Sequence, residues 1–147
     1  MNEVWQDKIP PQDIEAEQAV LGAIFLDSDT LIDAMEIVTP RSFYRRSHQI
    51  IFQSMIQLSN RGEAIDLVTL KAEIEKSNAL EDNGGISYLS ELSQSTPSSA
   101  SVSYYAKIVD DKSLLRQLIQ TANQIVVKSF EQGEEVQAIV DEAERSI

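Results

Sequence analysis

The residues of this chain that could do chemistry are few. His48 is the single histidine, and the sequence contains no cysteine. One histidine cannot supply the Glu-x-x-His pairs of a di-metal helical bundle, and thiolate metal ligands are absent. Because His48 falls beside the apolar face of a predicted helix, we predict a structural histidine with satisfied hydrogen bonds.

Neighbouring carboxylates are the next candidates for acid–base chemistry. Three pairs occur, namely Glu73 with Glu75, Asp110 with Asp111, and Glu134 with Glu135. Side chains one or two positions apart do not share a helix face, so these pairs are poorly placed to work together. We expect them to be solvated surface charges.

The sequence also gives no evidence of a phosphate-binding site. A P-loop needs a Gly-Lys-Ser/Thr segment, and no Gly-Lys dipeptide occurs; Gly84-Gly85 alone indicates a turn. Arg41, Arg45 and Arg46 form the nearest thing to a basic patch, but the net charge is −12. Since nucleic-acid-binding proteins usually present concentrated positive charge, we expect surface arginines and no strong direct DNA binding. We therefore predict no catalytic, cofactor-binding or metal-binding residues.

Composition places the chain in a broad class. The apolar fraction of 42% allows a folded core, and no apolar run approaches the roughly 20 residues of a membrane span. The chain does not begin with a secretory signal peptide, and the lack of cysteine is compatible with a reducing compartment. We expect a cytoplasmic protein without membrane contact.

Helical periodicity dominates the pattern, which predicts an all-α fold. Asp13 is a candidate N-cap, and Glu17 is suited to the positive end of the helix dipole. The segment 19–26 is apolar on every side, as in a helix at the centre of a core. We predict helices over 13–26, 30–38, 47–60, 66–77, 86–92, 101–131 and 134–147. A serine-rich connection with Pro97 divides residues 1–97, an amino-terminal arm that includes Trp5 and a compact helical head, from a helical hairpin at 98–147.

The predicted helix 101–131 has more apolar surface than a lone helix needs. Gly133 is expected to end it, so that it forms an antiparallel hairpin with the helix that follows. One apolar arc includes Leu115, Leu118, Ala122 and Val126, which we predict to serve hairpin packing and self-association. A neighbouring arc, from Tyr105 to Phe130, is interrupted by polar residues and remains unassigned.

An ordered series of short motifs runs through nearly the whole chain. It consists of Pro10-Pro11, the segment 14–22 (IEAEQAVLG), Phe43-Tyr44, His48, Ile51-Phe52, 65–67 with Thr69-Leu70, Gly84-Gly85, Tyr88-Leu89, Glu91-Leu92, 96–98, Tyr105-Ala106, Ile108-Val109 and Arg116. This order resembles the amino-terminal domain of bacterial replicative DNA helicases, the DnaB family. Each motif alone is a packing motif of low specificity, whereas their order is highly specific.

The resemblance implies a helical head and hairpin that form the collar of a hexameric ring, with hairpins pairing into dimers and dimers into a three-fold assembly. It implies a RecA-like motor behind a linker, absent from this sequence, to which ATP and Mg would belong. It also implies coupling to the primase C-terminal domain, with Tyr88, Ile119 and Ile125 as candidate residues, and contact with a helicase loader. For each of the three, direct contact and an indirect role in shaping the domain both remain open.

We therefore expect a non-catalytic assembly domain of a replicative helicase, cut near its linker, with a dimer as the favoured state of the isolated chain. The alternative from another class is a free-standing helical adaptor or regulatory protein-binding domain. A third hypothesis, an enzyme that uses carboxylates and the arginines near Phe43, has the least support.

Overall fold

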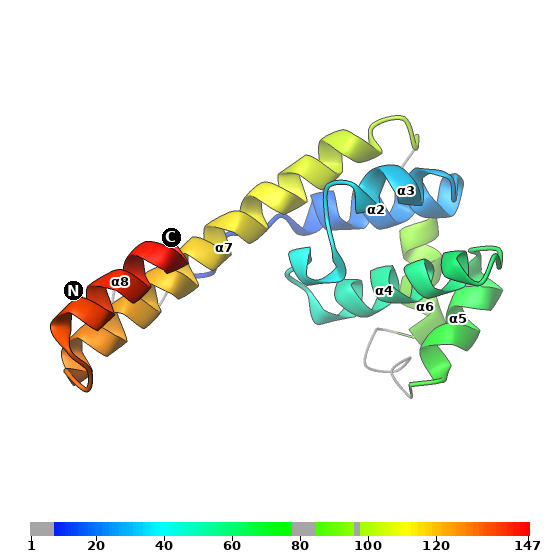
Figure 1. Cartoon of the computed structure of the whole chain (residues 1–147). Coiled ribbons are helices and arrows are strands. Elements are labelled where there is room, and N and C mark those ends of the chain that lie inside the picture. Colours follow the sequence, from blue (N-terminus) through cyan, green and yellow to red (C-terminus); the bar gives the residue numbers. More distant parts are fainter. Residues whose placement is uncertain (1–7, 78–84, 96–97) are drawn as a thin grey trace. The chain divides into compact units, whose positions relative to one another are not determined.

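The structure, a computed structural model, describes residues 8–77, 85–95 and 98–147, and these residues form helices and no strand. This confirms the predicted all-α fold. The elements are α2 (Ile14–Leu26), α3 (Thr30–Met35), the 3-10 turn η1 (Pro40–Ser42), α4 (Arg46–Asn60), α5 (Leu67–Glu75), α6 (Gly85–Ser93), α7 (Val102–Glu131) and α8 (Val136–Ser146) (Figure 1). None of these helices is long and apolar enough to cross a membrane.

The chain divides into two compact units. The first, called the head unit, is Gln12–Asp111, and the second, called the hairpin unit, comprises Met1–Pro11 and Lys112–Ile147. Three predicted features involve residues outside the described ranges: the amino-terminal arm at Trp5, the turn at Gly84, and the division after Pro97.

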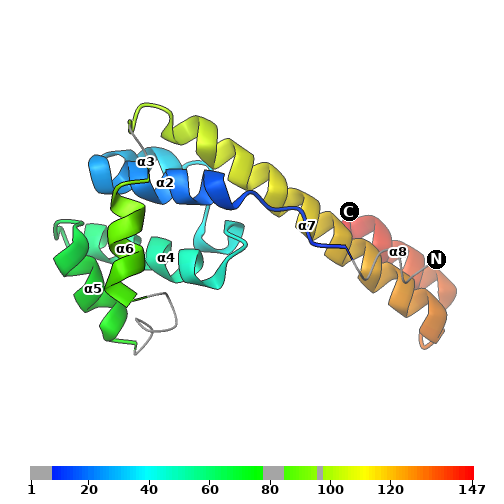
Figure 2. The same cartoon turned by 180° about the vertical axis from the view of Figure 1, so that it is seen from behind.

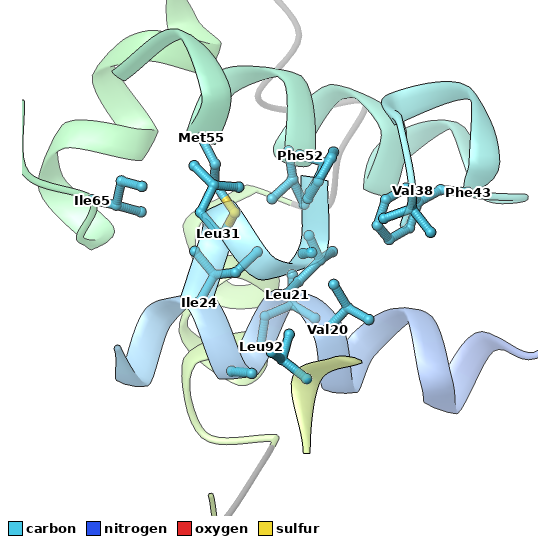
Figure 3. Close-up of a cluster of buried hydrophobic side chains, with 14 of the residues drawn as sticks. Val20, Leu21, Ile24, Leu31, Val38, Phe43, Phe52, Met55, Ile65 and Leu92 are labelled. Atoms are coloured by element: carbon cyan, nitrogen blue, oxygen red, sulfur yellow. The ribbon is translucent and has the colours of Figure 1, made fainter. Parts of the chain in front are cut away.

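The head unit is built around α2, as its uniform apolar character predicts. Asp13 is the N-cap, since its carboxylate accepts a hydrogen bond of 3.0 Å from the amide of Ala16. Figure 2 shows α2 against α6, with α4 and α5 in the same unit. Side chains from these helices, from α3 and from the residue after η1 form one buried cluster, which includes Val20, Leu21, Ile24, Leu31, Phe43, Phe52, Met55 and Leu92 (Figure 3).

The first turns of α7 complete the core of the head unit. Val102, Ala106 and Val109 are buried in the same cluster, and they recur at three- and four-residue spacing on one helix face. The serine-rich segment 98–101 precedes the first turn of α7, and the helix then continues without a break to Glu131. The predicted range of this helix, 101–131, is thereby confirmed.

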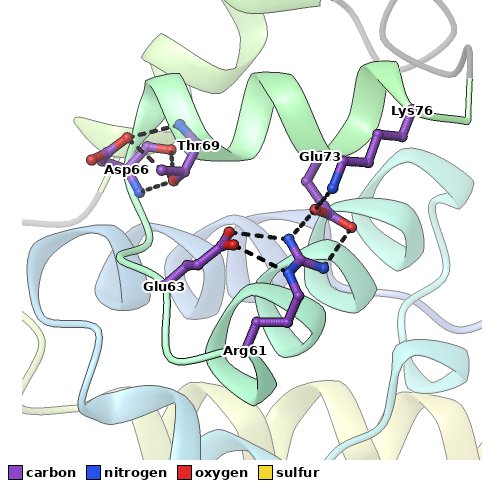
Figure 4. A network of polar contacts seen from close by, with 6 residues as sticks. All are labelled: Arg61, Glu63, Asp66, Thr69, Glu73 and Lys76. Atoms are coloured by element: carbon purple, nitrogen blue, oxygen red, sulfur yellow. Dashed lines mark hydrogen bonds and ion pairs between the residues drawn. The ribbon is translucent and has the colours of Figure 1, made fainter.

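The connection between α4 and α5 combines a backbone turn with a charged network. Gly62 has φ of 72°, a left-handed conformation that favours glycine. Arg61 donates to Glu73 at 2.5 Å and to Glu63 at 3.1 Å, and the Lys76 ammonium lies 3.2 Å from Glu73 (Figure 4). The hydrogen bond from Arg61, and secondarily that from Lys76, lowers the pKa of Glu73 below its ordinary value.

This network corrects the prediction for Glu73. Its side chain is 7% exposed and lies within the network, whereas we expected a solvated surface charge. Glu73 and Glu75 are neighbours in the sequence, but the charged partners of Glu73 are other residues. They are Arg61, on a turn twelve residues earlier, and Lys76, three residues later. The expectation that adjacent carboxylates do not act together is unaffected.

In the hairpin unit, α8 runs back along α7 (Figure 1). Ile125 of α7 lines the same narrow seam as Ile139 and Ala143 of α8, and Lys128 forms an ion pair with Glu142 beside it. Residues 8–11 also belong to this unit, because the Arg116 guanidinium donates a 2.8 Å hydrogen bond to the carbonyl of Pro11.

Several element ends differ from the predictions by one to three residues, and the end of α3 and the turn after α7 are the informative cases. Helix α3 stops at Met35, three residues early, although the following Val38 is buried as expected. At the end of α7 the left-handed residue is Gln132, with φ of 54°, and not the Gly133 that we expected to end the helix. The chain reverses one residue before the glycine, so the hairpin turn includes one strained non-glycine residue.

Candidate protein-interaction surfaces

Tyr88 joins a polar network in the head unit. Its hydroxyl lies 2.5 Å from Nε2 of His48, 3.2 Å from a guanidinium nitrogen of Arg45 and 3.3 Å from the amide nitrogen of Gln18. The rings of Tyr88 and His48 are stacked, with 5.9 Å between centroids. On the other side of the imidazole, Nδ1 lies 2.7 Å from the carboxylate of Glu17.

The donors and acceptors of this network indicate the direction of its hydrogen bonds. Arg45 and Gln18 can only donate to the Tyr88 hydroxyl, so the hydroxyl proton must point to Nε2 of His48. Nε2 is then an acceptor, which places the proton of a neutral imidazole on Nδ1, where it is donated to Glu17. The chain of hydrogen bonds thus runs from Tyr88 through His48 to a buried carboxylate.

Glu17 links this network to the start of α4. Its side chain is 2% exposed, and it accepts the backbone amides of Tyr44 at 2.7 Å and Arg45 at 3.4 Å. The buried carboxylate is tolerated because these two amides and Nδ1 of His48 are hydrogen-bonded to it. The backbone that presents Arg45 is therefore positioned by Glu17, and its side chain contacts Tyr88.

His48 is the structural residue that we predicted. It is fully buried, and both ring nitrogens have hydrogen-bonding partners. Within the described residues there is also no group of three histidine, aspartate or glutamate side chains arranged to hold a metal ion. The chemistry available at His48 is that of positioning, since its nitrogens are occupied within the fold.

A different kind of surface runs along α7 in the hairpin unit. The four predicted self-association residues, Leu115, Leu118, Ala122 and Val126, share one helix face and are all exposed. Leu118 is 54% exposed, and Val126 is 45% exposed. Phe130, at the end of the same face, is 76% exposed. A contiguous apolar face of this length on a helix is typical of a protein contact.

The structure places the three predicted primase-coupling residues in different surroundings. Ile119 is 45% exposed and borders the apolar face of α7. Ile125 lies six residues further on, half-buried in the seam against α8. Tyr88 belongs to the head unit and is half-buried, with its hydroxyl directed at His48. Ile119 is therefore available for contact, while Ile125 and Tyr88 are engaged in internal packing or hydrogen bonding.

Three residues in these surfaces were not among the predicted site residues. Glu17 was assigned to the helix dipole, although an acid beside the wholly apolar segment 19–26 could have indicated a buried carboxylate. Phe130 was in the unassigned arc. Arg45 was expected as an ordinary surface charge, and nothing in the local sequence relates it to Tyr88, which lies 43 positions away.

The helical fold, a histidine satisfied internally and a long exposed apolar helix face define a class of protein: a helical module for protein–protein contact. Comparison with known proteins identifies the family. The model of the DnaB-like helicase N-terminal domain matches residues 9–111, which is more than half of the chain. The chain belongs to this family, the N-terminal domain of bacterial replicative DnaB helicases.

Individual relatives agree with this assignment. The chain is 51% identical over 147 residues to the replicative DNA helicase DnaB of Geobacillus stearothermophilus, covering all of this chain and 32% of that protein. The crystal structure of the N-terminal domain of DnaB helicase from Mycobacterium tuberculosis superposes with a TM-score of 0.91 at 38% identity, covering 95% of this chain and 98% of that one. A DnaB-like replicative helicase, described together with its interactions with primase, matches with a TM-score of 0.74 at 27% identity over 92% of this chain and 32% of its own. The chain thus spans about a third of the full-length relatives.

Proposed function

We propose that this chain is a non-catalytic assembly domain of a replicative DNA helicase, which forms the collar of the hexamer and couples it to primase. The observation with the most weight is the exposed face of α7, where Leu118, Val126 and Phe130 leave a row of large apolar side chains in solvent. Family membership supports the helicase context, and the interactions with primase described for a related helicase support the choice of partner.

The proposed mechanism is geometric. Two copies pair through the α7 face, which removes the exposed apolar surface from water and makes a symmetric contact between identical helices. Three such dimers make the collar, and the ring holds the motor domains in register. The head unit remains available to primase, as does the edge of the α7 face where Ile119 lines an adjoining groove, and a helicase loader is a further partner of the collar.

Self-association is tested by sedimentation of the chain over a range of concentrations. We expect a dimer that Leu118→Asn with Val126→Asn weakens by more than about a hundredfold, because each lost apolar side chain contributes roughly 1.5–3 kcal/mol and 1.4 kcal/mol is tenfold. Val68→Asn is the matched control, since Val68 is 76% exposed in the head unit. A strict monomer at high micromolar concentration would count against the proposed collar.

The primase proposal is tested by titration with a primase C-terminal domain. Ile119→Asn should weaken binding while leaving the unfolding temperature unchanged, because Ile119 is exposed. Ile125→Asn should weaken binding and also destabilise the hairpin, because it places an amide in the seam with α8. Unchanged binding by Ile119→Asn in a normally folded chain would exclude a direct contact at this residue.

For Tyr88 we propose an indirect role. Its hydroxyl is used by His48 and Arg45, so its loss frees Arg45 from the position in which the network holds it. Tyr88→Phe and Arg45→Met should then weaken primase binding to a similar extent. If Arg45→Met binds as wild type while Tyr88→Phe does not, the tyrosine itself makes the contact.

A further inference from the structure

We propose that a groove on the head unit between η1, α4 and α5 binds a short acidic peptide segment of a partner protein. The groove has a volume of about 510 Å³, and its positive charges come from Arg41, Arg46 and Lys76. This inference concerns a different surface from the α7 face and is independent of the pairing of hairpins.

Five cations of the chain have carboxylate partners, whereas the two arginines of this groove have none within the described residues. Arg61, Lys71, Lys76, Lys107 and Lys128 all form ion pairs. Arg41 and Arg46 are exposed and form no ion pair within the described residues, although acids outnumber bases by 24 to 12 in the sequence. Two guanidinium groups left unpaired in one groove of so acidic a chain are available to an external anion.

Glu73, an acid in the groove wall, does not neutralise these arginines. Its carboxylate is already shared by Arg61 at 2.5 Å and by Lys76 at 3.2 Å. Its negative charge is thus balanced locally, and the two arginines leave the groove with a net positive potential. Carboxylates of a ligand can pair with each guanidinium in the planar, two-bond arrangement that arginine favours.

The scaffold under Arg41 is well defined. Pro40 begins η1, and the side chains and amides of Thr39 and Ser42 form a reciprocal capping box around the turn. Phe43, directly after η1, is buried in the core. Arg41 therefore projects from a fixed turn, so the ligand does not have to order the backbone that presents this guanidinium.

The remaining lining favours a peptide over a nucleic acid. Ile50, Gln53 and Gln57 follow one face of α4 along the groove, with spacings of three and four residues. The two amides can hydrogen-bond a peptide backbone, and Ile50 offers an apolar contact between them. A nucleic acid would extend its phosphates beyond the groove, where the net charge of −12 repels them.

The test measures binding of a short fluorescein-labelled peptide of alternating Glu and Gly to the full chain by fluorescence anisotropy at low salt. The counterpart with Gln in place of Glu is the neutral probe. We expect the acidic probe to bind and the neutral probe not to bind. Arg41→Gln with Arg46→Gln should weaken binding by at least about tenfold, equivalent to about 1.4 kcal/mol, and added salt should weaken it further.

Lys71→Gln with Arg145→Gln is the matched control, because it changes the net charge equally at two cations that do not line the groove. Equal weakening by both double variants would overturn the proposal in favour of general electrostatics, as would no binding of the acidic probe. Tighter binding of a single-stranded DNA probe, lost in Arg41→Gln with Arg46→Gln, would replace the peptide by a nucleic acid. Sedimentation of the same samples reports pairing of the hairpins separately, so failure of one proposal is distinguishable from failure of the other.

Discussion

Removing the hydroxyl of Tyr88 isolates the contribution of the network that joins α2, α4 and α6. In Tyr88→Phe the ring can keep its stacking on His48, while Nε2 of His48 loses the donor that lies 2.5 Å away. The imidazole is fully buried, so no water reaches this nitrogen from solvent. Arg45 is exposed and Gln18 half-buried, so both can turn to solvent at little cost.

The expected loss of stability therefore comes mainly from His48. An unsatisfied buried polar group costs about 1–3 kcal/mol. In a unit of about 100 residues, each kcal/mol corresponds to roughly 4–8 °C in unfolding temperature, so we expect a decrease of at least about 4 °C. At the upper limit of both ranges the decrease reaches about 24 °C. Differential scanning calorimetry at neutral pH measures the decrease directly, and chemical denaturation should show a lower midpoint with an unchanged m-value.

Tyr104→Phe provides the matched control for this substitution. Tyr104 is 69% exposed, so loss of its hydroxyl should change the unfolding temperature by no more than about 2–4 °C, as for most surface substitutions. If Tyr88→Phe unfolds at the same temperature as wild type, the assignment of the hydroxyl as donor to His48 is wrong. A decrease of similar size in both variants would indicate a general effect of the phenol group.

Further variants test the turns and the charged network. Gln132→Gly should stabilise the hairpin unit by about 1 kcal/mol, because Gln132 has φ of 54°, a conformation that glycine adopts more easily. Gly62→Ala should destabilise the head unit by a similar amount, because Gly62 has φ of 72°. Thermal unfolding measures both changes, and a change of the same sign in the two variants would contradict the conformational argument. Arg61→Met should destabilise most at neutral pH. Since Arg61 lowers the pKa of Glu73 and that of Glu63, its stabilisation is complete above the ordinary carboxyl pKa and is lost as the pH falls through the lowered values. The difference in unfolding temperature from wild type should therefore shrink below about pH 4, and a constant difference down to pH 2 would exclude the linkage.

Local patterns were sufficient to predict most of the secondary structure. Asp13 was recognised as an N-cap from its place before an apolar periodic run, and the structure shows its carboxylate accepting the amide of Ala16. The long helix was predicted because the segment from Ser101 to Glu131 has helical periodicity without proline or glycine. Both predictions depend on interactions within a few residues, which the sequence displays directly.

The network at Tyr88 could not be predicted in this way. Glu17 and His48 are 31 positions apart, and His48 and Tyr88 are 40 apart, so their meeting depends on how three helices pack. Periodicity does assign each residue to a helix face, but it gives neither the crossing angle nor the register of two helices. The same reason explains Glu73, whose guanidinium partner lies on the turn between α4 and α5.

The exposed face of α7 shows how much an apolar helical pattern in the sequence can predict about packing. The sequence predicted one apolar arc for two purposes, packing within the hairpin and contact between chains. The structure separates the residues available for each, because Ile125 lies in the seam with α8 while Leu118 and Val126 are exposed. Sequence alone could not make this division, since α8 can approach either side of so wide an apolar arc. Once α8 occupies one side, burial of the other requires a second chain, which is the physical basis of the proposed pairing.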